Sequence, residues 1–126
     1  MSKIIINTSN APAPIGPYSQ AVKTGNLLFI SGQVAIKPGT GELAMTDIPE
    51  ETHQVMHNLK AILTEAGMTF DNVVKTTIFL SDMLLFSEVN EVYGKYFSNT
   101  FPARETVAVK GLPKGVNVEI SMIAAE

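Results

Sequence analysis

Two segments of the chain are predicted to form strands that are buried on both faces, and they limit how the chain can fold. Leu27 to Ile30 is apolar at every position, and Val73 to Leu80 is rich in β-branched and aromatic residues. Strands of this kind are typical of a sheet that is covered on both sides. The chain must therefore supply two covers for the sheet, or a second molecule must supply one of them.

Only two helices are predicted to cover this sheet. The first spans Ile48 to Ala66, where apolar residues recur at helical spacing and Gly67 provides a left-handed stop. The second runs from about Phe86 to Ser98. Two helices can cover only one face of a sheet of about six strands. We therefore expect an α+β fold in a single domain, residues 1–126, whose second sheet face is covered by another subunit.

The other strands are predicted to pair as two hairpins. The segment 21–36 turns at Gly25-Asn26, a pair that suits a tight turn because it accepts positive φ. The segment 104–125 turns at Leu112-Pro113. Side chains alternate along a strand, so the second hairpin would place Glu119 on the same face as Arg104.

Arg104 is the first candidate for a binding residue. It is the one arginine among nine lysine and arginine residues. A planar guanidinium can hold a carboxylate or phosphate with two parallel hydrogen bonds, which a lysine cannot do. Arg104 and Glu119 could instead form a cross-strand ion pair on a solvated face. The sequence leaves both interpretations open.

The composition excludes several classes of function. The chain has no cysteine, so it can have neither a thiol nucleophile nor a disulfide nor a cysteine-based zinc site. A formal net charge of -3 with scattered lysines offers no basic surface for nucleic acid. No segment has the length of a membrane span or the pattern of a secretory signal. We therefore expect a cytoplasmic protein that binds neither nucleic acid nor membrane.

The two histidines, His53 and His57, have the spacing of two metal ligands on one face of a helix. A zinc-protease helix of this type carries a glutamate directly after the first histidine, whereas this chain has Gln54. Both histidines also lie opposite the apolar stripe of the first predicted helix. We expect solvated surface residues here and no metal site.

Three stretches together resemble one known family. They are GPYSQAV at 16–22, ISGQ at 30–33, and PAR at 102–104 followed by LPKGVNVEI at 112–120. The chain resembles the RidA/YjgF family of imine and enamine deaminases along its whole length. The resemblance implies a chorismate-mutase-like fold, a homotrimer and ligand clefts between neighbouring subunits. That assembly agrees with the sheet face that the chain cannot cover by itself.

The resemblance also implies roles for individual residues. Arg104 would bind the carboxylate of a small 2-imino acid such as 2-iminopropanoate or 2-iminobutanoate, and Glu119 would orient or activate the attacking water. An enamine such as 2-aminoacrylate would be converted to a 2-keto acid and ammonia. The residues expected to line the cleft beside Arg104 are Tyr18, Ser31, Gly32, Asn90 and Thr106. Neither a metal nor an organic cofactor is implied.

The chain departs from the family pattern at two positions near these residues. Thr106 stands where many members have cysteine, and Ser121 stands where many have a second glutamate. Thiol chemistry is therefore ruled out, and Glu119 must act without a neighbouring carboxylate. Two other functions stay open: a non-catalytic regulator that binds a small carboxylate, and an endoribonuclease or translation inhibitor. The acidic balance disfavours the latter.

Overall fold

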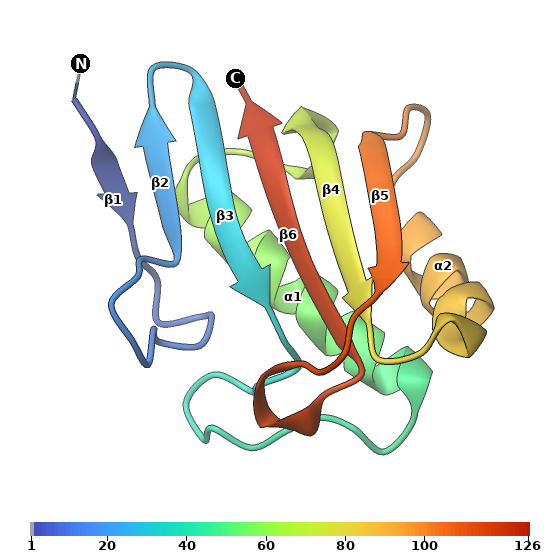
Figure 1. Cartoon of the computed structure of the whole chain (residues 1–126). Helices are drawn as coiled ribbons and strands as arrows, with labels where there is room; N and C mark the ends of the chain where they lie inside the picture. Colours follow the sequence, from blue (N-terminus) through green and yellow to red (C-terminus); the bar gives the residue numbers. More distant parts are fainter. Residues whose placement is uncertain (1) are drawn as a thin grey trace.

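The strands form one mixed sheet of six strands, and both helices lie on one of its faces (Figure 1). The computed structural model describes residues 2–126. The strand order is β1-β2-β3-β6-β4-β5, and β4–β5 is the parallel pair. The strands are β1 (Ile4–Ile6), β2 (Ala21–Thr24), β3 (Leu27–Gln33), β4 (Val73–Leu80), β5 (Ala103–Ala108) and β6 (Val118–Ala125), and the helices are α1 (Ile48–Glu65) and α2 (Phe86–Gly94).

The first hairpin and the first helix are confirmed, because local signals determine both. Gly25 has a φ of 58°, and the turn it makes pairs β2 with β3. The Asp47 side chain caps α1 by accepting a hydrogen bond from the Glu50 N–H at 2.8 Å. Gly67, with a φ of 75°, follows the end of the helix. No helix within residues 2–126 is long and apolar enough to cross a membrane.

The second helix is shorter than predicted. It ends at Gly94, not at Ser98, because glycine is a poor residue for a helix interior. The chain continues in tighter turns, in which Tyr96 N–H bonds to the Tyr93 carbonyl and Phe97 N–H to the Gly94 carbonyl. These turns still carry the Phe97 side chain into the core.

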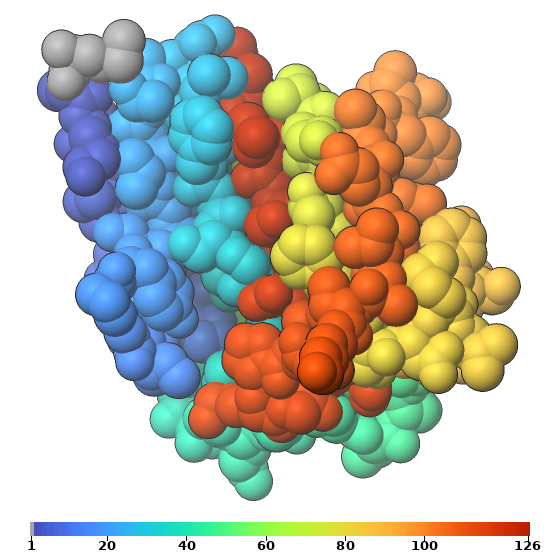
Figure 2. Space-filling view, in the orientation of Figure 1, coloured from blue at the N-terminus to red at the C-terminus, as the bar shows by residue number. Residues whose placement is uncertain are grey.

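The core fills the space between the helices and the sheet, and the opposite sheet face is open (Figure 2). Along β6 every second residue is buried under the helices. On the other face, Phe29 is 42% exposed and Val107 is 47% exposed. The strands predicted to be buried on both faces are thus buried on one face only within a single chain.

The predicted hairpin of the last two strands is wrong. Strand β4 lies between β5 and β6 and pairs with both, parallel to β5 and antiparallel to β6. The segment from β4 through α2 to β5 is a β-α-β unit, and the turn at Pro113–Gly115 carries the chain past β4 to the far side. Alternation tells which residues of a strand share a face, but it does not tell which strand is the neighbour.

A buried carboxylate holds the start of β6 against α1. Glu51 is 0% exposed. Its Oε2 accepts hydrogen bonds from the backbone N–H groups of Asn117 at 2.7 Å and Val118 at 3.1 Å, and its Oε1 accepts from Asn117 Nδ2 at 3.0 Å. These bonds satisfy N–H groups at the point where β6 enters the sheet, directly before Glu119.

We expect Glu51→Leu to lower the free energy of unfolding by about 3 kcal/mol, because it leaves buried N–H groups of β6 without acceptors. Asp47→Ala serves as a reference and should cost about 1 kcal/mol, the usual value for a lost helix cap. Urea unfolding at a fixed protein concentration measures both changes. Equal losses in the two variants would contradict an anchoring role for Glu51.

Candidate functional site

Glu119 lies on the open face of the sheet, where a bulge in β3 makes room for it. The pairing of β3 with β6 shifts by one residue between Ile30 and Gln33, so that Ser31 and Gly32 stand opposite a single residue of β6. A Cβ added at Gly32 would lie 2.8 Å from both Cδ and Oε2 of Glu119. Any other residue at position 32 would therefore force the Glu119 side chain to move.

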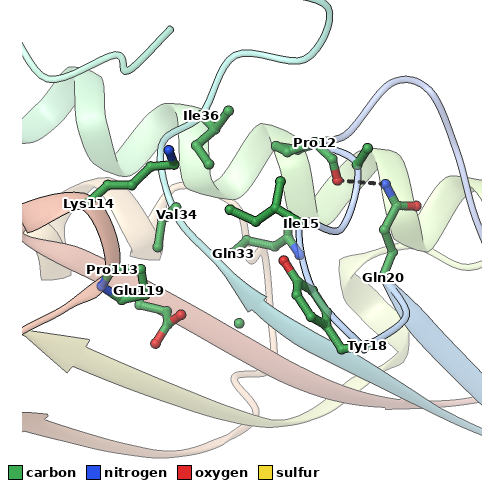
Figure 3. Close-up of a pocket in the computed structure, with 12 residues that line it drawn as sticks. Pro12, Ile15, Tyr18, Gln20, Gln33, Val34, Ile36, Pro113, Lys114 and Glu119 are labelled. Carbon is green, nitrogen blue, oxygen red and sulfur yellow. Dashed lines mark hydrogen bonds between the residues drawn. The ribbon is translucent and has the colours of Figure 1, made fainter. Parts of the chain in front are cut away.

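A cavity of about 80 Å³ opens beside Glu119. Figure 3 shows Glu119, Tyr18 and Ile15 converging on the same space from β6 and from the loop before β2. The rest of the wall is mainly apolar, with Lys114 at the rim as the one cation among the lining residues. The cavity thus combines one carboxylate with aliphatic and aromatic walls, an arrangement typical of small-molecule sites.

The Glu119 carboxyl is partly desolvated and unpaired. Its burial raises its pKa above the usual value. Neither ion pair of residues 2–126 involves Glu119, and none of the hydrogen bonds in that part of the chain reaches its oxygens. The carboxylate is therefore available to a ligand or a water.

Arg104 lies on the helix face of the sheet and is held by α2. Its guanidinium carbon is 5.2 Å from the centroid of the Tyr93 ring and 5.6 Å from that of Phe86. Its Nη1 donates a hydrogen bond to Asn90 Oδ1 at 2.5 Å. Stacking and one amide thus orient the guanidinium and leave its other N–H groups free.

An open hollow of about 460 Å³ adjoins Arg104, with Asn90 and Phe101 among its lining residues. Thr106 lies two residues further along β5 and faces the same side of the sheet. Its buried hydroxyl is without a hydrogen-bond partner in residues 2–126. A buried hydroxyl in this state costs free energy, which a bonded ligand or partner group would recover.

Arg104 and Glu119 lie on opposite faces of the sheet. Arg104 pairs with Thr76, which is buried under α2, whereas Glu119 pairs with Phe79 on the open face. The expectation that Glu119 shares the face of Arg104 is wrong, and with it the ion pair between them within one chain. The ion pair that β5 does form is between Glu105 and Lys75 of β4, whose Oε1 and Nζ atoms are 3.0 Å apart.

The sequence-predicted residues therefore fall into two groups. Tyr18, Gly32 and Glu119 line the first cavity, and Asn90 and Arg104 line the second. Ser31 lines neither, because its Oγ donates a hydrogen bond to the Ser19 carbonyl at 2.6 Å and so fastens the loop to β3. We name the first group the Glu119 half-site and the second, together with Thr106, the Arg104 half-site.

Sequence reasoning missed the two aromatic residues that stack on Arg104. On the sequence alone, both Phe86 and Tyr93 fall within the second predicted helix, 86–98, with no indication of a role at the site. A signal was available, because positions 86, 90 and 93 recur at helical spacing and so share one face of α2 with Asn90. Lys114 was also missed; its φ of 59° is rare for a residue other than glycine.

The histidine pair differs in part from the expectation. His57 is exposed as predicted, but His53 is half-buried, and its Nδ1 lies 2.6 Å from the Tyr96 hydroxyl. Within residues 2–126 no group of three or more histidine, aspartate or glutamate side chains is placed to hold a metal ion.

Comparison with known proteins gives one consistent family. The sequence pattern of the family described as endoribonuclease L-PSP matches residues 8–126. A RutC family protein of Pyrococcus horikoshii is 53% identical over 97% of each chain, and a mouse protein named 2-iminobutanoate/2-iminopropanoate deaminase is 49% identical over 100% of this chain and 96% of its own. The crystal structure of Escherichia coli TdcF with bound serine superposes with a TM-score of 0.94, at 40% identity over 98% of each chain. The chain therefore belongs to the endoribonuclease L-PSP family, which is the RidA/YjgF family.

Proposed function

We propose that the chain is a deaminase that hydrolyses 2-imino acids, such as 2-iminopropanoate and 2-iminobutanoate, to 2-keto acids and ammonia. The observation that carries the proposal is that the chain presents, on opposite faces of its sheet, a free, partly desolvated carboxylate at Glu119 and an arginine fork at Arg104 that no carboxylate occupies. The name of the mouse relative and the serine bound to TdcF support a small amino-acid-like substrate.

Arg104 holds the substrate carboxylate in this proposal. Its stacking on Phe86 and Tyr93 and its bond to Asn90 reduce the rotamer freedom that the side chain would otherwise lose on binding. The free N–H groups can then form two parallel bonds to the carboxylate oxygens. The imine carbon, next to the carboxylate, is thereby fixed in position.

Glu119 acts on the water that attacks this carbon. The substrate reacts in its iminium form, protonated on nitrogen; an enamine such as 2-aminoacrylate reaches this form by gaining a proton at its terminal carbon. The water oxygen bonds to the iminium carbon as the C=N π electrons move to nitrogen, and one water proton passes to the Glu119 carboxylate, giving a neutral tetrahedral aminoalcohol. Glu119 then returns this proton to the nitrogen, the C–N bond breaks with release of ammonia, and the hydroxyl proton passes to Glu119 as the C=O bond forms. A raised pKa suits a group that both accepts and returns a proton.

The complete site is formed between subunits, because one chain presents Arg104 and Glu119 on opposite faces of its sheet. The Arg104 half-site of one copy must meet the Glu119 half-site of the next. Such a contact joins two different surfaces, and it closes as a ring when the rotation between successive copies allows it. We propose the homotrimer of chorismate-mutase-like fold that the family resemblance implies, with the exposed Phe29 and Val107 buried inside it.

The direct test supplies 2-aminoacrylate, generated in place by a serine-dehydrating enzyme, and records release of ammonia and keto acid. Acceleration above the spontaneous rate supports the deaminase. If the protein binds small 2-keto or amino acids without any acceleration, it is a regulator that uses the same cleft, and the proposed reaction is wrong.

Arg104→Lys should weaken transition-state binding by about 1.5 to 3 kcal/mol, or about ten- to a hundredfold in kcat/KM, because the ammonium retains the charge but not the fork. Steady-state kinetics with the imine substrates measure the change, and a raised KM should account for part of it. The control is Lys75→Arg, an exchange between the same two residue types on the open face of the sheet. Asn90→Asp is not a suitable control, because the new carboxylate would pair with Arg104. Wild-type kcat/KM in Arg104→Lys would show that no bidentate grip is used.

Glu119→Gln should lower turnover by about a hundredfold or more with a smaller change in KM, because the amide keeps the shape but cannot accept the proton. In the wild type, kcat/KM should fall as the pH drops through the pKa of Glu119. Since burial raises that pKa, the midpoint should lie above the ordinary 4.5. This fall of kcat/KM at low pH should be absent from the residual activity of Glu119→Gln. If the variant shows the same fall, a group other than Glu119 causes it.

Mixed oligomers of two inactive variants should regain activity. In trimers assembled at random from equal amounts of Arg104→Ala and Glu119→Ala chains, about a quarter of the sites would combine an intact arginine with an intact glutamate. Co-expression followed by activity assay and light scattering measures the recovery and the oligomeric state. Each variant alone is the control. No recovery in mixed trimers would place both residues of a working site in one chain.

A further inference from the structure

The loop before β2 forms one wall of the Glu119 cavity but makes few bonds of its own. Ile15 and Tyr18 line the cavity, yet they are 76% and 51% exposed. Within residues 2–126, the hydrogen bond made by segment 13–18 is an internal one, from Tyr18 N–H to the Gly16 carbonyl. The position of this wall must therefore be determined at the two ends of the loop.

The far end of the loop is fastened to β3. Ser31 Oγ donates to the Ser19 carbonyl at 2.6 Å, and Ser31 N–H donates to the Gln20 carbonyl at 2.9 Å. Both bonds attach to the bulge that makes room for Glu119. This end would hold Tyr18 near the cavity, but it leaves Pro12 and Ile15 undetermined.

The near end of the loop is held by one buried side chain, that of Gln20, which is 2% exposed. Its Oε1 accepts a hydrogen bond from Thr8 N–H at 2.7 Å. Its Nε2 lies within hydrogen-bond distance of three carbonyl oxygens, those of Thr8 at 3.0 Å, Ala11 at 3.3 Å and Pro12 at 2.9 Å, and shares its two hydrogens among them. Figure 3 shows Gln20 directed toward Pro12, with the bond to that carbonyl drawn. A single amide thus holds residues 8–12 against Gln20, and we call this closed end of the loop its neck.

We propose that Gln20 is a positioning residue for the imine-hydrolysing site, acting through the loop that carries Ile15 and Tyr18. The inference rests on the proposed function. By closing the neck, the amide holds the apolar wall against Glu119 and limits the access of water to its carboxylate. Prolines at 12, 14 and 17 stiffen the segment between the two ends, so that a fixed neck determines the place of the whole wall.

The charge environment of Glu119 makes the effect of this wall measurable. Among the lining residues, Tyr18 from the loop and Lys114 from the Pro113–Gly115 turn are the titratable groups that face the cavity; β3 contributes the uncharged Gly32 and Gln33. The adjacent residue of β4 is Phe79. In the proposed trimer, Arg104 of a neighbouring copy adds one fixed positive charge. Desolvation is the cause of the raised pKa of Glu119, so loosening the wall should lower it.

The test compares Gln20→Met, which keeps length and removes all four hydrogen bonds, with Asn72→Ala. Asn72 donates from Nδ2 to the Ala125 carbonyl at 3.0 Å, at the end of β6 remote from Glu119, and so controls for loss of a structural amide. Titration of the ¹³C-labelled Glu119 carboxyl by NMR gives its pKa without requiring activity. Steady-state kinetics give KM and kcat.

We expect the Glu119 titration midpoint to move to lower pH in Gln20→Met, with KM raised about three- to tenfold and a smaller change in kcat. Asn72→Ala should leave the midpoint and KM as in the wild type. An unchanged midpoint and KM in folded Gln20→Met would overturn the proposal. If Gln20→Met does not fold, Gln20→Asn, which retains an amide one methylene shorter, should show the same two shifts at smaller size; their absence there overturns it equally.

Failure of the proposed function is distinguishable from failure of this inference. A wild type without imine hydrolysis, but with a Glu119 midpoint that falls in Gln20→Met, would leave the positioning role intact and remove the reaction. A wild type that hydrolyses imines, with neither midpoint nor KM responding to Gln20, would retain the reaction and remove the positioning role.

Discussion

Two helices cannot cover both faces of a six-stranded sheet, and most features of this molecule depend on that shortage. The covered face holds the core and, at its edge, Arg104 under α2. The open face holds Glu119 beside exposed apolar side chains such as Phe29. Exposed apolar side chains that lie together on a surface favour aggregation unless a partner covers them. A second copy of the chain can provide that cover. The face that lacks a cover is thus also the face that carries the Glu119 carboxylate.

The separation of Arg104 from Glu119 preserves the chemistry of both. Were the two side chains neighbours in one chain, the guanidinium would bind the carboxylate, lower its pKa and occupy the fork. In this structure β4 stands between their strands, and aromatic stacking on Tyr93 orients the arginine in place of an anion. Glu119 keeps a raised pKa through desolvation alone. Within one chain, neither group is therefore neutralised by the other; in the proposed trimer they would meet only across the cleft that the substrate enters.

Local signals in the sequence predicted the elements well, and the arrangement of the last strands poorly. Gly25 and the Asp47 cap act within a few residues, so the first hairpin and α1 could be predicted from them. The place of β6 between β3 and β4 depends on contacts across many residues, including those of Glu51 with Asn117, and nothing in the alternation of β6 specifies its neighbours. Arg104 was identified as a candidate because it is the one arginine, and the remaining candidates by the resemblance, whereas their division between two faces required the structure.

The turn that carries the chain past β4 has an unusual backbone, and its position gives it meaning. Lys114 adopts a φ of 59° and is followed by Gly115 at 67°, so the chain reverses within two residues before β6. A left-handed conformation at a lysine costs about 1 kcal/mol and persists only where the surroundings require it. Here the surroundings are Glu51, which fixes the strand after the turn, and the Glu119 cavity, whose rim Lys114 forms. The strained turn therefore lies between the Glu51 anchor of β6 and the cavity that Glu119 shares with Gly32.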